Sequence, residues 1–551
     1  MPACFPLDGR SRMTTTTTNV AYPWWQEAVI YQVYLPSFAD SNGDGIGDLP
    51  GVTSRLAYLA ELGVTALWVS PFFTSPQADN GYDISDYYDV APRYGTLDDV
   101  DMLVTQAHAH GMRLIIDIVA NHTSTEHPWF KEALASPAGS PARDRYIFRD
   151  GRGDDHAEAP NNWTSMFSES AWARPAGDTQ WYLHSFSDKQ ADLNWHNTEV
   201  KDEFRRIMQF WMARGVDGFR MDAAMCMMKR ADFADTAPTD TDDPLLHQPG
   251  ILDLHREFRS FMNEYPEHCL IGEVLANDQR QVLDYVGPDK LHQVFAFNYQ
   301  YAYWNRTALQ NTITQSLQSA NVGSMPIWVT SSHDQVRHVS RLGLTVPGYL
   351  PGGLGPMSEQ PSWSLGQARA RAMICMTAFL PGALCLYYGE ELGLPDHTQL
   401  EDRYRKDPRF QPGQYNGRDG CRIPMPWDSN APAFGFSTQT DTWLPQPSCY
   451  HHYAVDRQQH WGGSMLTLYR QLLALRKQFE LARHPLQWLP TLRNDVLMAC
   501  CGGLVLAINF GHTSVRLPTK GTVVARSHPH IALRNGMLPG NAAIWLRPEQ
   551  P

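Results

Sequence analysis

Short apolar runs alternate with amphipathic runs along most of this chain, and that alternation constrains the fold more than any other feature. A near-continuous apolar run bounded by turn residues is typical of a strand buried on both faces, as in a parallel sheet covered by helices. Eight such units in succession predict an α/β protein built on a closed (β/α)8 barrel. The predicted strands are residues 28–35, 64–70, 113–119, 218–223, 269–274, 293–297, 326–330 and 383–388. The predicted helices include residues 51–62, 98–110, 199–214, 252–265, 312–319 and 366–380.

The helix at residues 199–214 and the strand that follows it form the clearest unit. Apolar side chains recur at helical spacing along one face of this segment, which predicts a helix packed against a core. Gly215 stands where a helix commonly ends, because glycine tolerates the left-handed conformation of the residue after the last turn. On the strand at 218–223, Arg220 and Asp222 point to the same side. An isolated pair of this kind predicts only a structural salt bridge. Whether the pair has a function depends on the other motifs of the chain.

Two regions interrupt the alternation. Residues 121–188 are polar and rich in proline, glycine and tryptophan, and they are too long for an ordinary loop, so we expect an inserted subdomain after the third strand. Residues 481–551 change to short alternating runs, which predict a small antiparallel β-sandwich domain. The barrel then takes residues 21–120 and 189–480, and the polar residues 1–20 are predicted to form a disordered leader.

The charge balance bears on possible partners. The chain of 551 residues has a formal net charge of −13 and a pI near 5.9, which disfavours nucleic acid as a partner. No run approaches the roughly 18 to 20 apolar residues of a membrane span, and residues 1–20 lack the apolar segment of a secretory signal. Nine cysteines without C-x-x-C spacing are typical of reduced thiols. We therefore expect a cytoplasmic protein without a nucleic-acid or membrane partner. The sequence does not indicate its oligomeric state.

Reactive side chains gather at the carboxyl ends of the predicted strands, which form the working face of a parallel barrel. Several acids around one opening repel one another, so that one can stay protonated while another is ionised. Cleavage of an acetal needs that division, because one carboxylate attacks the sugar carbon and one acid protonates the leaving oxygen. Each acid alone could be structural, but the set predicts a sugar-cleaving site. Its members are Asp117, His122, Arg220, Asp222, Glu273, His333 and Asp334.

Four segments that contain these residues resemble, in order, the signature regions of the α-amylase family of glycoside hydrolases, family 13. They are DIVANH at 117–122, GFRMD at 218–222, IGEV at 271–274 and SHD at 332–334. Three more segments are similar to the oligosaccharide α-glucosidase branch of that family: QADLN at 190–194, YGEELG at 388–393 and GRDGCRIPMPW at 417–427. The resemblance extends from about residue 24 to residue 427 and implies a barrel enzyme that acts on small oligosaccharides or α-glucosides.

The resemblance implies a catalytic role for each matching residue. Asp222 would be the nucleophile that forms a glucosyl ester, and Glu273 would be the general acid and then the base. Asp334 would stabilise the distorted, positively charged sugar, and the anomeric configuration would be retained. Arg220 would hold Asp222 ionised and oriented, and Asp117 would brace the site.

The resemblance also implies how the sugar is held. His122 and His333 would bind hydroxyl groups of the glucose, and Phe167 would pack on its ring. A closing set would pair around the non-reducing glucose, which favours removal of single units from chain ends. That set consists of Tyr82, Asp83 and Arg422.

Four positions bear on the details of the site. Ser332 stands where relatives usually have asparagine, and residues 168–169 are Ser-Glu where relatives usually have Gly-Gly. Ala223 follows the expected nucleophile; members that prefer α-1,6 bonds tend to have valine there, and members that act on α-1,4 bonds tend to have alanine or threonine. We therefore expect a preference for α-1,4 bonds, unless Ala223 only packs the barrel.

An acidic loop at residues 40–48 has the spacing of a calcium loop. It places oxygen ligands at alternate positions, with Gly45 at the turn, but Gly51 stands where a bidentate glutamate would complete a helix-loop-helix site. The resemblance implies structural Ca²⁺ or Mg²⁺ far from the chemistry; the alternative is a turn without a metal. The predicted ligands are Asp40, Asn42, Asp44, the Ile46 carbonyl and Asp48.

Three functions fit these features. The first is a retaining, exo-acting α-glucosidase that releases glucose from short α-glucosides, preferring α-1,4-linked malto-oligosaccharides, with transfer of glucose to other acceptors as a further activity. The second is a sucrose hydrolase or an isomerising transglucosidase with the same machinery. The third is a non-enzymatic, glycosidase-like binding protein, which the presence of all three acids disfavours.

Overall fold

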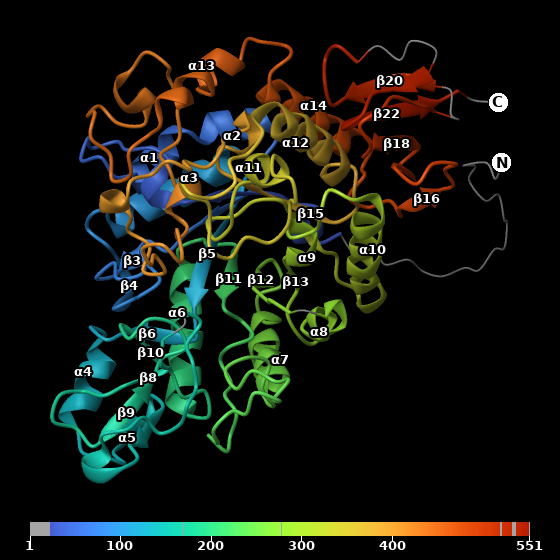
Figure 1. Cartoon of the computed structure of the whole chain (residues 1–551). Coiled ribbons are helices and arrows are strands. Elements are labelled where there is room, and N and C mark those ends of the chain that lie inside the picture. Colours follow the sequence, from blue (N-terminus) through green and yellow to red (C-terminus); the bar gives the residue numbers. More distant parts are fainter. Residues whose placement is uncertain (1–21, 168, 277, 518–520, 532–535, 550–551) are drawn as a thin grey trace.

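The computed structural model describes residues 22–167, 169–276, 278–517, 521–531 and 536–549 (Figure 1). The predicted leader at residues 1–20 lies outside the described residues. Among the described helices, none is long and apolar enough to cross a membrane.

An eight-stranded parallel sheet forms the centre of the molecule, which confirms the predicted barrel. The strand order is β13-β12-β11-β5-β2-β1-β15-β14, and a parallel bridge between Phe295 and Ile327 joins the two ends of this order. Almost every strand residue is buried, as expected for strands covered on both faces. The strands are β1 Val29–Val33, β2 Ala66–Val69, β5 Arg113–Val119, β11 Gly218–Asp222, β12 Cys269–Gly272, β13 Gln293–Val294, β14 Ile327–Val329 and β15 Ala383–Tyr387.

Helices surround the sheet, and their ends follow local chemistry. The first predicted helix is two helices, because the chain leaves helical geometry at Arg55. Thr96 and Asp99 form a capping box at the start of α3, and Gly215 follows α6 with φ +91°. The helices against the barrel include α1 Leu49–Ser54, α2 Leu56–Leu62, α3 Leu97–Ala109, α6 Thr198–Ala213, α7 Ile251–Met262, α10 Arg306–Ser316, α12 Trp363–Thr377 and α14 Met465–Gln478.

The segment after β5 leaves the barrel, as Figure 1 shows in teal at the lower left. Two short strands, β6 His122–Ser124 and β10 Gln190–Asp192, pair antiparallel at its base. Between them lie α4 Pro128–Ala135, α5 Pro141–Asp144 and the three-stranded sheet of β7 Phe148–Asp150, β9 Gln180–Leu183 and β8 Trp172–Ala173. Trp163 and Trp172 lie in a small apolar core of this segment's own. Both ends of the segment therefore return to the carboxyl side of the barrel.

A five-stranded antiparallel sheet at the other end of the chain packs on α12. Its order is β16 Gln487–Leu489, β17 Val496–Cys501, β18 Leu504–Asn509, β22 Ala542–Pro548 and β20 Gly521–Arg526. A two-stranded sheet of β19 Val515–Arg516 and β21 Met537–Leu538 accompanies it. Trp545 on β22 is fully buried: its ring lies edge-on to Phe379, and its indole N–H donates to the Cys375 carbonyl at 2.8 Å. This contact joins the sheet to the barrel.

Candidate active site

A cavity of about 210 Å³ opens at the carboxyl ends of the barrel strands. It brings together all but three of the predicted catalytic and sugar-binding residues; the exceptions, Asp83, Asp117 and Arg422, do not line it. Its charged lining residues are Asp79, Asp222, Glu273, Asp334, Arg220, Arg409 and Arg418, and its other lining residues include Trp68, Tyr82, His122, Phe167, Gln190, Tyr301, His333 and Tyr349.

Arg220 is the electrostatic centre of this cavity. It is almost completely buried on β11, and its guanidinium contacts three carboxylates: Asp117 at 2.6 Å, Asp222 at 2.5 Å and Glu273 at 2.8 Å. The Trp68 indole N–H donates to the other oxygen of Asp117 at 2.8 Å. A buried charge of this kind is stable only with partners close by. Asp117 thus braces Arg220, in agreement with the role that the family resemblance implies for it.

The environment separates the acids chemically. Burial raises the pKa of Glu273 to about 7, against the pull of Arg220, and neighbouring Asp222 adds to the rise. Burial likewise raises the pKa of Asp222 to about 6, because Arg220 offsets only part of the cost of charging it. Between these two values Glu273 is protonated while Asp222 is ionised. The pair therefore provides an acid and a nucleophile at the same pH.

Asp334 behaves in the opposite way. Burial opposes its ionisation, but the guanidinium groups of Arg418, Arg422 and Arg220 hold the pKa of Asp334 well below its usual value. Arg418 and Arg422 contact its carboxylate at 2.8 Å and 3.3 Å. Asp334 is therefore a permanent negative charge, suited to a cationic sugar ring and not to proton transfer.

His333 is held as a neutral ring. Burial lowers the pKa of His333 to about 3. Its Nδ1 accepts a hydrogen bond from the Gln32 amide at 2.6 Å, so the proton lies on Nε2, which is 2.9 Å from the Tyr82 hydroxyl and 3.3 Å from Asp334. The Tyr82 and His333 rings stack with centroids 5.4 Å apart. This arrangement presents a hydroxyl and an N–H to the cavity.

His122 also lines the cavity and is neutral, since burial lowers its pKa. Its Nε2 is 3.0 Å from the Gln190 amide and 3.1 Å from the Tyr82 carbonyl. Behind it, the buried Lys229 forms an ion pair with Asp192 at 2.8 Å. Lys229 therefore fixes the base of the inserted segment and does not contact Asp222.

The predicted partnership of Asp83 with Arg422 is wrong. Asp83 is fully buried, and its carboxylate accepts hydrogen bonds from Ser75 Oγ and from the backbone N–H groups of residues 78 and 79. Asp83 therefore closes the turn that carries Tyr82. Arg422 donates from Nε to the His333 carbonyl at 2.8 Å and lies over the Tyr34 ring. It supports Asp334 from behind.

Asp79 and Arg418 make the contact that was predicted for the other pair. Arg418 Nη2 lies 3.1 Å from Asp79 and 2.7 Å from Asp407, and its Nη1 lies 2.8 Å from Asp334. Burial raises the pKa of Asp79, and Arg418 opposes that rise. Arg418 stands inside the motif at 417–427, four positions before Arg422, and Asp79 lies four positions before Asp83. The sequence therefore predicted the segments that form this wall of the cavity, but not the residues of those segments that contact each other.

Aromatic side chains complete the lining. Phe167 lies edge-on to Phe186 with centroids 5.8 Å apart and near the Arg418 guanidinium. Ala223 lines the cavity with φ +44°, and its N–H donates to Glu273 Oε2 at 2.9 Å, so this backbone conformation orients the carboxyl group. Ser332 lines the cavity, and its Oγ accepts a hydrogen bond from the Gln300 amide at 3.3 Å.

The acidic loop at residues 40–48 closes on itself through backbone amides. The Asp40 carboxylate accepts from the N–H groups of residues 42, 43 and 45, and Asp48 caps α1 at Gly51 N. Asn42 and Asp44 each accept from the N–H group two residues later. Its oxygen-only donor set suits Ca²⁺ or Mg²⁺, but no group of three or more Asp, Glu, His or Cys side chains in the described part of the chain is arranged to hold a metal ion. The residues of the loop therefore fit such an ion by their chemistry alone, and none of them lines the active-site cavity.

A larger cavity of about 380 Å³ lies between the inserted segment and the barrel. Asp144 is the only acid among its described lining residues, beside Arg143, Arg149 and Lys229. Without a pair of acids it lacks the means to cleave an acetal. The chemistry therefore belongs to the smaller cavity around Arg220.

A parallel barrel with two acids of divided pKa and a third fixed negative charge at its carboxyl end is the arrangement of a glycoside hydrolase. The chain matches the family model "Alpha amylase, catalytic domain" over residues 32–484, and it belongs to the α-amylase family, glycoside hydrolase family 13. It is therefore an enzyme.

Curated relatives cover most of the chain. A probable alpha-glucosidase of Rhizobium meliloti (strain 1021) is 38% identical over 499 residues, which are 84% of this chain and 85% of the relative. An oligo-1,6-glucosidase of Parageobacillus thermoglucosidasius is 34% identical over 83% of this chain and 84% of its own length. A trehalose-6-phosphate hydrolase of Escherichia coli (strain K12) is 36% identical with the same two coverages. The family thus includes several α-glucoside specificities at nearly equal distance.

Solved structures agree with this placement. The crystal structure of the alpha-glucosyl transfer enzyme XgtA matches with a TM-score of 0.84 at 34% identity, over 96% of this chain and 100% of that one. The trehalulose synthase MutB from Pseudomonas mesoacidophila MX-45 matches with a TM-score of 0.85 at 28% identity over the same shares. The chain is a family 13 glycoside hydrolase of the α-glucosidase group.

Proposed function

We propose that this enzyme is a retaining, exo-acting α-glucosidase that releases glucose from the non-reducing end of short α-glucosides. The observation that carries the proposal is the triple contact of Arg220 with Asp117, Asp222 and Glu273, in a buried cavity that gives Glu273 a pKa near 7 and Asp222 a pKa near 6. An attacking carboxylate and a protonated acid then coexist near neutral pH.

In the first step, an ionised oxygen of Asp222 bonds to C1 of the glucose as the bond from C1 to the leaving oxygen breaks. Glu273 gives its proton to that oxygen, so the leaving group departs as a neutral alcohol. The sugar carries positive charge in the transition state, and the fixed charge of Asp334 stabilises it. The product of the step is a covalent glucosyl ester on Asp222.

In the second step, Glu273 is a carboxylate and removes a proton from water. The water oxygen bonds to C1 as the ester bond to Asp222 breaks, which restores both carboxyl groups and releases glucose with its original configuration. An alcohol in place of water gives a new glucoside by the same sequence. We include this transfer in the proposal.

Exo action is supported by the wall that Arg418 forms with Asp79 and Asp334. That wall lines the same cavity as Tyr82 and His333. Its charged groups would bind hydroxyl groups of one terminal glucose. The preference for α-1,4 bonds and malto-oligosaccharides is proposed from Ala223, whose methyl group lines the cavity beside Asp222. A small side chain there leaves room for the second sugar.

A second candidate is a sucrose hydrolase or isomerising transglucosidase with the same carboxylates. The likeness to the trehalulose synthase MutB over 96% of the chain favours keeping it. It differs from the first candidate only in the leaving group and acceptor, so activity on sucrose and the identity of the products separate the two.

The test is a substrate panel of maltose, isomaltose, sucrose, trehalose and an aryl α-glucoside, with wild type beside Asp222→Asn. We expect maltose and the aryl glucoside to be cleaved faster than isomaltose, and the variant to lose nearly all turnover because an amide supplies no attacking oxyanion. Asp232→Asn, an exposed neighbour on the same segment, is the matched control. Full turnover in Asp222→Asn would refute the mechanism; sucrose as the best substrate would favour the second candidate.

Two further parts of the proposal rest on the sequence. We propose that the loop at residues 40–48 binds Ca²⁺ or Mg²⁺ in a structural role, supported by its oxygen donors. We also propose a cytoplasmic location, supported by the cysteine pattern. Small α-glucosides are the only partners that the site itself calls for.

A further inference from the structure

Three arginines line the active-site cavity, and they differ in their partners. Arg220 contacts three carboxylates, and Arg418 contacts three others. Arg409 contacts no carboxylate among the described residues; the one hydrogen bond of its guanidinium goes to the Pro351 carbonyl at 3.2 Å. Most of the donors of this third guanidinium are therefore available to a ligand.

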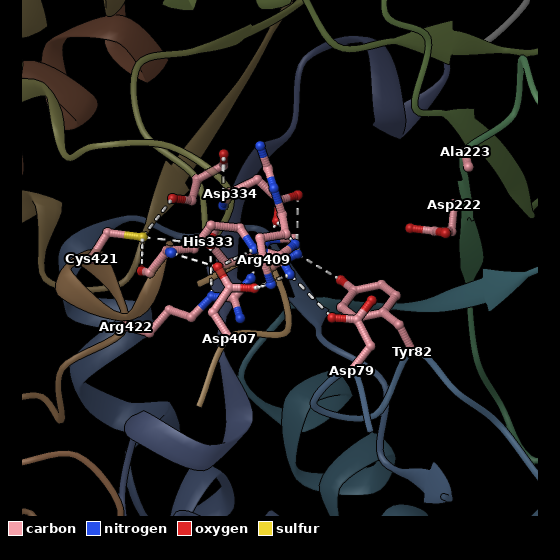
Figure 2. Close-up of polar contacts among 12 residues, drawn as sticks. Asp79, Tyr82, Asp222, Ala223, His333, Asp334, Asp407, Arg409, Cys421 and Arg422 are labelled. Carbon is pink, nitrogen blue, oxygen red and sulfur yellow. Dashed lines mark hydrogen bonds and ion pairs between the residues drawn. The ribbon is translucent and has the colours of Figure 1, made fainter. Parts of the chain in front are cut away.

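The backbone fixes where Arg409 stands. Its N–H donates to Asp407 at 3.1 Å, and Asp407 also holds Arg418, so the segment carrying Arg409 is anchored to the wall of the cavity. Figure 2 draws Arg409 together with Asp334 and Asp407. Pro351 belongs to the loop between α11 His338–Leu342 and α12, so Arg409 lies where two loops of the cavity mouth meet.

Two tyrosines stand at the same mouth. Tyr301 and Tyr349 line the cavity, with ring centroids 4.6 Å apart, and Tyr349 is 50% exposed. The deep end is different: Trp68, Tyr82 and His333 are buried there. A glucose bound at the deep end against Asp222 and Glu273 would direct its leaving group toward the half-buried Tyr301, the exposed Tyr349 and Arg409.

We propose that Arg409, Tyr301 and Tyr349 form a subsite that recognises a carboxylate on an aromatic leaving group. A single guanidinium without a carboxylate partner presents one planar fork, which matches one carboxylate, and the tyrosine faces suit an aromatic ring. A phosphate dianion calls for a second base, and the other two arginines of the lining are already paired. The preferred substrates of this subsite are α-glucosides of hydroxylated aromatic acids. The inference rests on the proposed α-glucosidase activity.

The test compares two glucosides that differ in one charge, 4-carboxyphenyl α-D-glucoside and its neutral isostere 4-carbamoylphenyl α-D-glucoside. At pH 7 we expect wild type to favour the acid in kcat/KM by about tenfold, the size of one charge-assisted hydrogen bond. In Arg409→Gln the acid-to-amide ratio should fall to near one, and Arg409→Lys should give an intermediate ratio, because it keeps the charge and loses the fork. Thermal melting of both variants establishes that they fold.

Arg403→Gln is the matched control. Arg403 lies six positions earlier, is exposed, pairs with Glu401 and does not line the cavity. It should keep the wild-type ratio and the wild-type activity. An equal kcat/KM for acid and amide in wild type, or a ratio that survives in folded Arg409→Gln, overturns the subsite while leaving the α-glucosidase in place. If wild type cleaves neither glucoside nor maltose, the proposed function fails, and the subsite with it.

Discussion

At the scale of single residues, the site depends on one buried arginine that shares its charge among three acids. Burial raises the pKa of all three acids, and Arg220 opposes that rise. The pKa values of Asp117 and Asp222 reach about 6, whereas the pKa of Glu273 reaches about 7. A single unit of pKa corresponds to about 1.4 kcal/mol. The small separation between Asp222 and Glu273 is therefore enough to divide their roles, and it makes the activity sensitive to pH.

The two pKa values predict a bell-shaped dependence of kcat/KM on pH. Below a pH of about 6 Asp222 is protonated and cannot attack, so activity should rise as pH increases through that value. Above a pH of about 7 Glu273 is ionised and has no proton to give, so activity should fall. Initial rates on an aryl α-glucoside between pH 4.5 and pH 9 measure both limbs.

The Glu273→Gln variant separates the limbs. With a 2,4-dinitrophenyl glucoside, whose leaving group needs no proton, this variant should keep the acid limb and lose the alkaline one. A wild-type profile that stays flat from pH 5 to pH 8 contradicts the assignment of these two carboxyl groups.

The sequence predicted which three acids meet around the cavity. It did not predict that Asp79 and Arg418 form the ion pair beside them. The three strand-end acids follow from the barrel, because parallel strands deliver their carboxyl ends to one opening. The choice between Asp79 and Asp83 depends on the turn before Tyr82, where Gln77 and Asn80 have positive φ of 69° and 51°. Non-glycine residues adopt this conformation rarely and without a local pattern, so spacing alone could not show which carboxylate faces Arg418.

At the scale of elements, the strands were predicted within one or two residues wherever they are buried on both faces. The exception is the sixth: the chain turns into the short helix α9 Phe297–Gln300, so β13 is only Gln293–Val294. The helix α10 begins six residues before the predicted helix at 312–319. Asn305 caps it, but only Leu309, Ile313 and Ser316 are buried along it, too few for a clear apolar stripe.

Metal binding at the loop of residues 40–48 is tested by removing the ion. After dialysis against EDTA, addition of Ca²⁺ or Mg²⁺ should raise the melting temperature, because an ion at a hundred times its Kd adds about 2.7 kcal/mol to the folded state. Differential scanning calorimetry with and without the ion measures the shift.

The control for this experiment is Asp44→Ser. Asp44 is exposed and accepts the Ile46 N–H, and serine keeps an oxygen for that contact while it removes the charge. The variant should melt at one temperature in either buffer. If wild type also melts identically in both, the loop is closed by its amides alone and the metal is excluded.

At the scale of the whole molecule, the C-terminal sheet and the barrel meet through a few large side chains. Trp545 and Phe379 are both fully buried at this contact. Short alternating runs predicted the strands of this sheet, but not the face that docks on α12. Such docking joins residues more than a hundred positions apart, and no local pattern encodes it.

Truncation of Trp545 to alanine should weaken the union of sheet and barrel. The change removes a buried ring and one hydrogen bond, and we expect a loss of about 3 to 5 kcal/mol in the free energy of unfolding. Because the active site lies at the carboxyl ends of the strands, kcat/KM on an aryl glucoside at 25 °C should stay near the wild-type value. Thermal melting and initial rates provide the two measurements.

Trp461→Ala is the companion variant, since Trp461 is 61% exposed and the same truncation there should change stability by less than about 0.5 kcal/mol. Equal melting temperatures for Trp545→Ala and wild type would mean that the Trp545 contact adds nothing to the stability of the protein.

The ring of eight strands is not equally strong all the way around. Between β5 and β11 five residue pairs are in register, whereas between β13 and β14 the ring is joined by the single bridge from Phe295 to Ile327. The well-paired strand β11 carries Arg220 and Asp222. The weakly paired end after β13 carries Phe295 and continues through Phe297 to Tyr301. Thermal fluctuations of the backbone should therefore be largest near β13 and β14, where the strands are paired least. The side chains around the reacting carbon therefore stand on the most firmly paired strands, and Tyr301 follows the strand that is paired least.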